Sequence, residues 1–141
     1  MAFIPKKTKY TRYQKGKVKK TKSKGNQMLY GFYALKALQK GYLTPKHIET
    51  GRRAIRKYIK EENGIIWIRA FADYPVTLKA SEIRMGRGKG KVDHWACKVS
   101  SGKILYEIDN IKKATAYKAL LNGSKKLPLR SKVITRSVYD F

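Results

Sequence analysis

The sequence predicts an α+β domain: an α/β sandwich with a mixed or antiparallel sheet, about two helices, a basic extended N-terminal arm and a Gly-rich basic loop. Three observations lead to this class. Residues 45–61 have the apolar period of a helix, residues 65–109 contain several short apolar segments, and residues 6–26 have no apolar period. We therefore expect an arm over 1–27 and a single folded domain over 28–141.

The arm is the most basic part of the chain. Residues 1–48 contain 13 Lys and Arg and no carboxylate, because the first acidic residue is Glu49. Residues 6–26 mix lysine with Thr, Ser, Gly and Tyr, so this stretch has no core of its own. Such a basic run indicates an extended arm that is ordered by what it binds, with a solvated mobile tail as the alternative.

The first structured segments are a short strand and a helix. MLYGFYALKAL (28–38) is ambiguous, and a strand is favoured because it contains Gly31 and GYLT follows it. Thr44 can cap the helix over 45–61, and Pro45 fits its first position. The predicted apolar face consists of Ile48, Gly51, Ile55, Tyr58 and Ile59. The opposite face carries the cations Arg52, Arg53, Arg56, Lys57 and Lys60, of which some are expected to contact phosphate.

The middle of the chain is predicted to form strands. IIWIRAF (65–71) has the composition of a strand buried on both faces, and ADYPVTLK (72–79) contains a proline typical of an edge segment or connection. Residues 92–100 and 103–109 are expected to form a hairpin around a Ser101-Gly102 turn.

A second helix and a last strand complete the predicted domain. Asn110 can cap a helix over 111–122 that Asn122-Gly123 would end. Its predicted apolar face consists of Ala114, Tyr117 and Leu121. LPLRSKVITRSVY (127–139) then alternates as a strand does.

The charge of the chain indicates a polyanionic partner. Thirty-four Lys and Arg against 9 Asp and Glu give a formal net charge of +25, and self-repulsion on this scale opposes compaction unless a polyanion neutralises it. Ten Tyr, four Phe and two Trp exclude a purely disordered basic tail. A folded body with this excess of cations favours nucleic acid over an anionic membrane surface, because no long apolar run is present. No signal peptide or organellar presequence is recognisable, and the single Cys97 suits a reducing compartment.

RMGRGKGKVDHW (84–95) is the candidate binding loop. A phosphate-binding loop of a nucleotide pocket needs Ser or Thr after its Gly-Lys pair and a helix behind it, but Gly90 follows Lys89 and the next segment is a predicted strand. The spacing of the glycines does not fit a dinucleotide fingerprint either. A flexible hairpin connection and a cationic loop pressed against RNA remain, since glycines allow close backbone approach and arginines can stack on bases.

We expect no catalytic site, no metal site and no cofactor. His94 and Cys97 are three residues apart in a predicted strand, so their side chains point to opposite faces, and His47 is the only other histidine. These ligands are too few for a closed zinc site, although a carboxylate could join them.

Several segments resemble the bacterial-type ribosomal protein L-sixteen family of the large subunit. The most specific is RMGRGKG, separated by four residues from Trp95. Five other blocks follow the family's order across nearly the whole chain: PKKTKY (5–10), GRRAIRKY (51–58), IWIRAFADYPVT (66–77), GKILYEID (102–109) and KLPLRSKVI (126–134).

The resemblance implies a structural protein of the ribosome that binds large-subunit ribosomal RNA beside the aminoacyl-tRNA site, and hence tRNA and neighbouring ribosomal proteins as partners. It implies neither a membrane partner nor a homo-oligomer. The loop that would face the tRNA and the peptidyl transferase region consists of Arg84, Met85, Gly86, Arg87, Gly88, Lys89, Gly90 and Lys91. The arm cations that would follow the RNA backbone are Lys6, Lys7, Lys9, Arg12, Lys15, Lys17, Lys19 and Lys20.

Composition also suggests where the protein works. A strong bias to lysine, isoleucine and tyrosine is typical of an AT-rich organellar genome, and FADYPVT and RMGRGKG resemble mitochondrial members slightly more than plastid ones. We therefore expect a mitochondrial ribosome, with a plastid or bacterial cytoplasmic ribosome as the alternative. The functional alternative is an RNA-binding module or RNA-modifying factor outside the ribosome.

Overall fold

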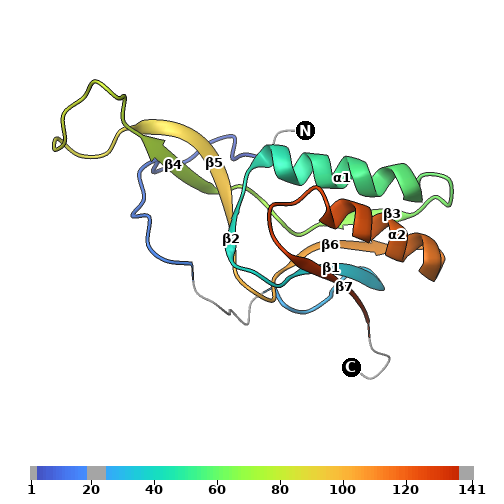
Figure 1. The fold of residues 1–141 in the computed structure, drawn as a ribbon. Helices are drawn as coiled ribbons and strands as arrows, with labels where there is room; N and C mark the ends of the chain where they lie inside the picture. Colours follow the sequence, from blue (N-terminus) through green and yellow to red (C-terminus); the bar gives the residue numbers. More distant parts are fainter. Residues whose placement is uncertain (1–2, 19–24, 137–141) are drawn as a thin grey trace.

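Two helices cover one face of a four-stranded antiparallel sheet, and a three-stranded antiparallel sheet extends away from this body (Figure 1). The arrangement comes from a computed structural model, which describes residues 3–18 and 25–136. It confirms the predicted α+β class with about two helices.

The elements follow in the order β1 (Tyr33–Ala37), β2 (Gly41–Leu43), α1 (Pro45–Ile59), β3 (Ile65–Ile68), β4 (Tyr74–Leu78), β5 (Lys91–Val99), β6 (Ile104–Asp109), α2 (Lys113–Ser124) and β7 (Ser131–Thr135). The larger sheet has the strand order β3-β6-β1-β7, and the smaller one has the order β2-β5-β4. The short strand predicted within 28–38 is β1, and the proline-containing segment 72–79 is the edge strand β4, as expected.

Helix α1 begins as the sequence predicts. The Thr44 side chain accepts a hydrogen bond from the backbone N–H of His47 at 3.3 Å, and Pro45 occupies the first turn. Ile48, Gly51, Ile55 and Ile59 are buried at intervals of three and four residues. The prediction is wrong for Tyr58, which is exposed because Ile59 occupies the core position of that turn.

The cap of α1 allows a direct test of this helix. Replacing Thr44 by alanine should lower the free energy of unfolding by about 1 kcal/mol, because the N–H of His47 loses its acceptor. Thermal unfolding of the full chain measures the change. Thr50→Ala is the matched control, since the exposed Thr50 hydroxyl bonds only to the Lys46 carbonyl within the helix. An equal loss in both variants would contradict the capping role.

The predicted hairpin around Ser101-Gly102 is wrong. Strands β5 and β6 follow each other in the chain but belong to different sheets. The turn between them bonds instead to the end of β1: the Gly102 N–H donates to the Ala37 carbonyl at 2.7 Å, and the Ala37 N–H donates to the Lys103 carbonyl at 2.9 Å. The turn therefore joins the two sheets, and β5 pairs with β2 and β4.

Helix α2 begins later than predicted, and Asn110 does not cap it. The N-cap position is Lys112, whose side chain makes no capping bond. The Glu62 carboxylate, from the loop after α1, accepts instead from the Lys112 N–H at 3.0 Å and from the Thr115 hydroxyl at 2.8 Å. The backbone bond from Lys112 is the main reason that the pKa of Glu62 is lowered. A cap supplied from a distant loop leaves no local sequence signal.

The apolar face of α2 is also displaced from the prediction. Ala116, Ala119 and Leu120 are buried, whereas the predicted residues Ala114, Tyr117 and Leu121 are all exposed. Gly123 lies inside the helix and does not end it. A Cβ atom there would lie 2.6 Å from Cγ1 of Ile55, so this glycine lets the two helices approach each other.

The strand that is buried on both faces is β6, not the predicted segment 65–71. Strand β3 covers only Ile65–Ile68 at the edge of the sheet, and the Ile65 side chain is exposed. Strand β6 lies between β3 and β1, and its residues 104–108 are all buried. Position within the sheet, which composition does not reveal, decides between the two.

Candidate nucleic-acid interface

The Gly-rich loop stands at the end of a projecting hairpin. Strands β4 and β5 form a ribbon that leaves the body, and the residues connecting them lie at its far end (Figure 1). Residues 84–89 are all exposed, and the Met85 side chain is 99% exposed. The loop therefore presents cations, glycines and one apolar side chain without packing on the body.

The loop backbone needs its glycines. Gly86, Arg87 and Gly88 have successive φ angles of 99°, 52° and 81°, in the left-handed region that side chains disfavour. Glycine is needed at position 90 for a different reason: a Cβ atom there would collide with the backbone carbonyl of Leu78 on the opposite side of the hairpin. Gly86 and Gly88 thus allow the backbone conformation of the loop tip, and Gly90 allows the two strands to approach each other at its base.

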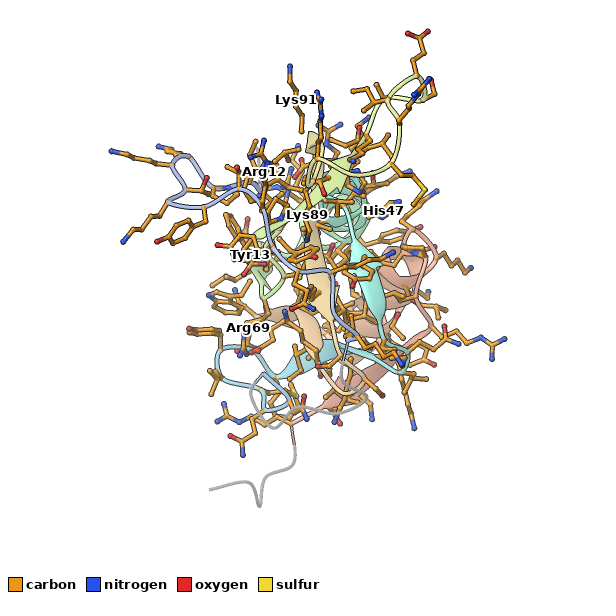
Figure 2. The ribbon with its side chains drawn as sticks, turned by 90° about the vertical axis from the view of Figure 1, so that its left-hand side faces the viewer. Arg12, Tyr13, His47, Arg69, Lys89 and Lys91 are labelled. Carbon is orange, nitrogen blue, oxygen red and sulfur yellow. The ribbon has the colours of Figure 1, made fainter. Side chains whose placement is uncertain are left out.

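The N-terminal arm is fastened along this hairpin. Three successive arm carbonyls accept hydrogen bonds from it: Tyr13 from the Lys89 ammonium, Gln14 from the Tyr74 hydroxyl at 3.1 Å, and Lys15 from the Lys98 ammonium at 3.0 Å. Figure 2 shows Arg12 and Tyr13 beside Lys89, where the arm crosses the hairpin. The expectation that only a partner orders the arm is therefore too simple for this stretch, since side chains of the hairpin hold its backbone.

The arm cations remain exposed beside this attachment. Every predicted arm residue that the structure describes is exposed: Lys6, Lys7, Lys9, Arg12, Lys15 and Lys17. Lys19 and Lys20 lie outside the described residues. In the loop, Arg84, Arg87 and Lys91 are exposed, whereas the Lys89 ammonium is engaged by the arm. Arm and loop together form one basic projection.

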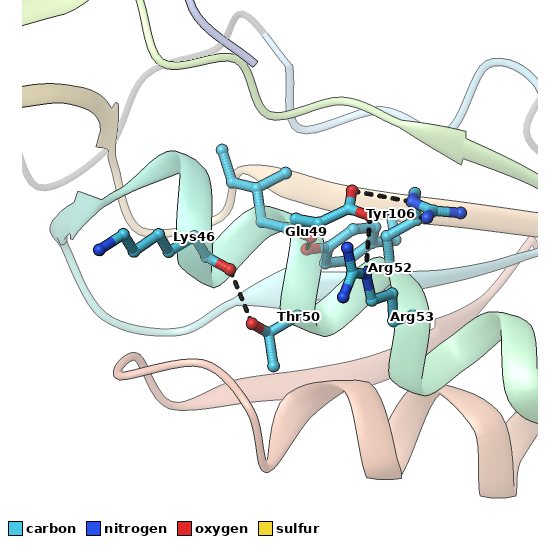
Figure 3. A network of polar contacts seen from close by, with 7 residues as sticks. Lys46, Glu49, Thr50, Arg52, Arg53 and Tyr106 are labelled. Atoms are coloured by element: carbon cyan, nitrogen blue, oxygen red, sulfur yellow. Dashed lines mark hydrogen bonds and ion pairs between the residues drawn. The ribbon is translucent and has the colours of Figure 1, made fainter. Parts of the chain in front are cut away.

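The cations of α1 divide into two groups. Glu49 holds Arg52 in a two-pronged ion pair, with 2.9 and 2.7 Å between the atoms, and also contacts Arg53 at 3.0 Å (Figure 3). The bond from Arg52 is the main reason that the pKa of Glu49 is lowered to about 2. Arg56 and Lys57 are exposed and make no ion pair with the described residues. The C-terminal half of α1, which carries them, points away from the loop (Figure 1).

A buried carboxylate fixes the junction between arm and body. Glu107 on β6 has no exposed surface, and one of its oxygens accepts from the N–H groups of Leu29, Tyr30 and Gly31 at 3.1, 2.7 and 2.9 Å. Its other oxygen bonds to the Arg69 guanidinium. Burial acts to raise the pKa of Glu107, but these four donors outweigh it and lower the pKa. Sequence reasoning missed this site, although the single acidic residue inside ILYE was a signal.

The described residues offer no metal centre. His94 is half-exposed and bonds to Asp93 at 2.6 Å, whereas Cys97 is buried on the opposite face of β5. Within residues 3–18 and 25–136, no three His, Cys, Asp or Glu side chains are close enough to hold a metal ion. No described helix has the length and apolar character to cross a membrane.

Comparison with known proteins assigns the family. Residues 5–134 match the model of the family described as ribosomal protein L16p/L10e. A large ribosomal subunit protein uL16 from Alkalilimnicola ehrlichii is 44% identical over 134 residues, which is 95% of this chain and 97% of that protein. The proteins of the same name from Caulobacter vibrioides and Allorhizobium ampelinum are 46% and 43% identical over 132 residues, which cover 94% of this chain and 92% and 96% of theirs. This chain therefore belongs to the ribosomal protein L16p/L10e family.

Proposed function

We propose that this chain is a non-enzymatic structural protein of the large ribosomal subunit, where it binds ribosomal RNA and helps to position tRNA at the aminoacyl site. The single observation that carries the proposal is the joint projection of the arm and the glycine loop. Its cations are exposed, and the self-repulsion of a chain with a net charge of +25 is relieved when a polyanion binds to it. The printed name of the three relatives supports the large subunit as its location.

Phosphate contacts are assigned to two surfaces. The first is the basic projection, with the arm cations Lys6, Lys7, Lys9, Arg12, Lys15, Lys17, Lys19 and Lys20 along the RNA backbone. The second is the exposed side of α1, where Arg56 and Lys57 make no ion pair with any residue that the structure describes and Arg53 is paired with Glu49. Arg52 contributes least, because Glu49 already satisfies its guanidinium on two sides.

The loop tip is assigned to the tRNA side. Arg84, Met85, Gly86, Arg87 and Gly88 form the outermost part of the hairpin, and Lys89, Gly90 and Lys91 lead to its base, where Gly90 faces Leu78. Lys89 ties the arm to the hairpin, so its role is to hold the projection together. The side chains of the tip are exposed, which suits a segment that completes its contacts on a bound molecule.

A mitochondrial ribosome is the proposed location. The support is the bias to lysine, isoleucine and tyrosine, together with the likeness of FADYPVT and RMGRGKG to mitochondrial members. Immunoblotting of gradient-purified mitochondrial, plastid and cytoplasmic ribosomes from the source cells tests this location. A signal confined to either of the last two fractions would contradict it.

Sedimentation tests the ribosomal role. The chain should travel with the large subunit through a sucrose gradient at high salt, because many simultaneous phosphate and packing contacts must be lost before it leaves. Recovery of the protein at the top of the gradient would overturn the proposal in favour of an RNA-binding module or RNA-modifying factor outside the ribosome.

A substitution at Gly88 tests the role of the loop independently of the rest of the interface. Gly88→Val should weaken binding of tRNA to the aminoacyl site about tenfold while the protein still enters large subunits. A Cβ atom at Gly88 would meet no other atom within 4 Å, so the substitution causes no clash. Its φ of +81° is unfavourable for a β-branched residue, which destabilises the native loop conformation by about 1–3 kcal/mol. Filter binding of tRNA to reconstituted subunits measures the affinity of the aminoacyl site, and sedimentation measures how much protein enters the large subunit.

Gly25→Val is the matched control for Gly88→Val. Gly25 also has a positive φ, of +86°, with one side-chain atom at 3.8 Å, but it lies outside the loop. It should leave tRNA binding by assembled subunits unchanged. Equal losses of tRNA binding and assembly in Gly88→Val would mean that the loop has only a structural role.

A further inference from the structure

A cavity lies between part of the N-terminal arm and the smaller sheet. Its volume is about 310 Å³, and its lining includes Tyr13, Lys15, Tyr42, Tyr74, Lys89 and His94. This volume is at the lower end of the range of about 300–1,000 Å³ that is typical of small-molecule pockets. The cavity therefore has room for one small planar group.

The strand register explains why aromatic and cationic side chains meet there. Paired residues in an antiparallel sheet share a face, and the pairs Tyr42–Lys98, Tyr74–Ala96 and Val76–His94 are all in register. The alternate pairs, such as Leu43–Cys97, turn toward the core. One face of the small sheet consequently carries two tyrosines, a lysine and a histidine, and the arm crosses this face.

The aromatic rings keep surface available along the cavity wall. The Tyr74 ring is tilted by 48° to Tyr13 and by 36° to Tyr42, with centroids 6.2 and 6.1 Å apart, so neither pair is stacked face to face. The Lys98 ammonium lies 3.7 Å from the Tyr74 ring centroid, and the Tyr74 hydroxyl is fixed on the Gln14 carbonyl. Lys15, Lys89 and His94 place positive or hydrogen-bonding groups around the same opening.

We propose that this cavity binds one unstacked nucleobase of ribosomal RNA, with the tyrosine rings as the stacking surface and the exposed Lys15 on an adjoining phosphate. The inference rests on the proposed RNA-binding function and names a subsite within it. Every base has a flat π face, so tyrosine stacking recognises the unstacked state and not a particular base. Ribosomal RNA is the assigned source because the cavity is lined by arm residues Tyr13 and Lys15, and the arm is the segment assigned to the ribosomal RNA backbone, whereas the loop tip is assigned to tRNA.

The test uses the full chain and two RNA hairpins of equal length, one with a single bulged 2-aminopurine and one with the same base paired. A bulged base has already lost its pairing, so it enters a pocket at less cost than a paired one. Tyr13→Leu should weaken binding of the bulged hairpin about tenfold and leave the paired hairpin unchanged. The arm stays fastened in this variant, because Tyr13 contacts Lys89 through its main-chain carbonyl.

Tyr10→Leu is the matched control. Tyr10 is an exposed tyrosine of the same arm that does not line the cavity, and its substitution should change neither affinity. The 2-aminopurine fluorescence should fall on binding to the unaltered protein and to Tyr10→Leu, but not on binding to Tyr13→Leu. Equal affinity of the unaltered protein for both hairpins, or an equal loss for both in Tyr13→Leu, would overturn the subsite.

Chemical probing of assembled subunits distinguishes a base of ribosomal RNA from a base of bound tRNA as the occupant of the cavity. Large subunits that carry Tyr13→Leu should show one newly reactive ribosomal RNA nucleotide when no tRNA is present. A change confined to nucleotides of bound tRNA would overturn the assignment to ribosomal RNA. If this subsite is absent, Tyr13→Leu still sediments with the large subunit and probing is unchanged, whereas failure of the ribosomal role leaves even the unaltered chain at the top of the gradient.

Discussion

Replacing Glu107 by alanine should lower the free energy of unfolding by about 3–5 kcal/mol. The change leaves three backbone N–H groups at residues 29–31 without their acceptor inside the protein. It also removes the carboxylate that pairs with the Arg69 guanidinium, which keeps only the Gln27 carbonyl, at 3.3 Å. Thermal unfolding of the isolated full chain should show a drop of roughly 10 °C or more in Tm. Because these bonds fix the segment where the arm joins the body, the variant should also enter large subunits less efficiently.

Two controls isolate the cause of this loss. Glu107→Gln keeps one carbonyl oxygen for the three N–H groups but places an amide NH2 group against the Arg69 guanidinium, so it should lose stability, although less than the alanine variant. Glu82→Ala removes an exposed carboxylate from the β4–β5 connection and should leave Tm nearly unchanged. A Glu107→Ala protein as stable as Glu82→Ala would contradict the role of the buried carboxylate.

The same carboxylate makes stability depend on pH in the acid range. The pKa of Glu107 is lower in the folded chain than its ordinary value of 4.5, so the folded state holds its proton less tightly than the unfolded state. Its contribution to stability is complete above pH 4.5 and is lost as the pH falls through the folded pKa. Glu49, with a pKa of about 2, adds a loss in the same direction. The unaltered chain should therefore lose stability below pH 4.5 more steeply than Glu107→Gln, and parallel curves would contradict this linkage.

Neutralising the arm should change RNA binding more than any other surface substitution. With Lys6, Lys7, Lys9, Arg12 and Lys15 all replaced by glutamine, the slope of log K against log salt should decrease by about 3.5–4.5, because each lost phosphate contact removes about 0.7–0.9. Substitution is preferable to deletion, since the carbonyls of residues 13–15 fasten the arm and Phe3 packs on the core. Fluorescence titration with large-subunit ribosomal RNA at several salt concentrations measures the slope.

An equal change of charge elsewhere provides the control for the arm. Five exposed lysines on and around α2 can be replaced by glutamine in the same way: Lys112, Lys113, Lys118, Lys125 and Lys126. Both variants lower the formal net charge from +25 to +20, so a general field effect would change both slopes equally. The α2 variant should retain most of the original slope. An unchanged slope in the arm variant would mean that the arm is a solvated tail.

Local signals in the sequence predict part of this fold well. Thr44 and Pro45 specify the start of α1 through a side-chain acceptor and a fixed φ, both of which depend only on neighbouring residues. The regular spacing of Ile48, Ile55 and Ile59 predicts the buried face for the same reason. The loop at 84–91 is also recognisable, because glycines at alternate positions are needed by its own backbone.

Features that depend on distant residues could not be predicted in this way. Glu62 caps α2 from another loop, and Ile55 explains the glycine at position 123. The Ser101-Gly102 turn has the composition of a hairpin, but its partner is the end of β1. The role of Lys89 could not be predicted either, because it depends on the position of the arm. The sequence places Lys89 in the loop, but its ammonium group bonds to the Tyr13 carbonyl.

The most direct measurement of the central claim is a cryo-EM map of large subunits purified through a tag on this chain. The map should contain the chain on ribosomal RNA, with arm residues 6–17 along the RNA backbone and the tip at Arg84–Gly90 directed toward the aminoacyl-tRNA site. A map in which this hairpin points into solvent, or a tagged chain that purifies without large subunits, would contradict it.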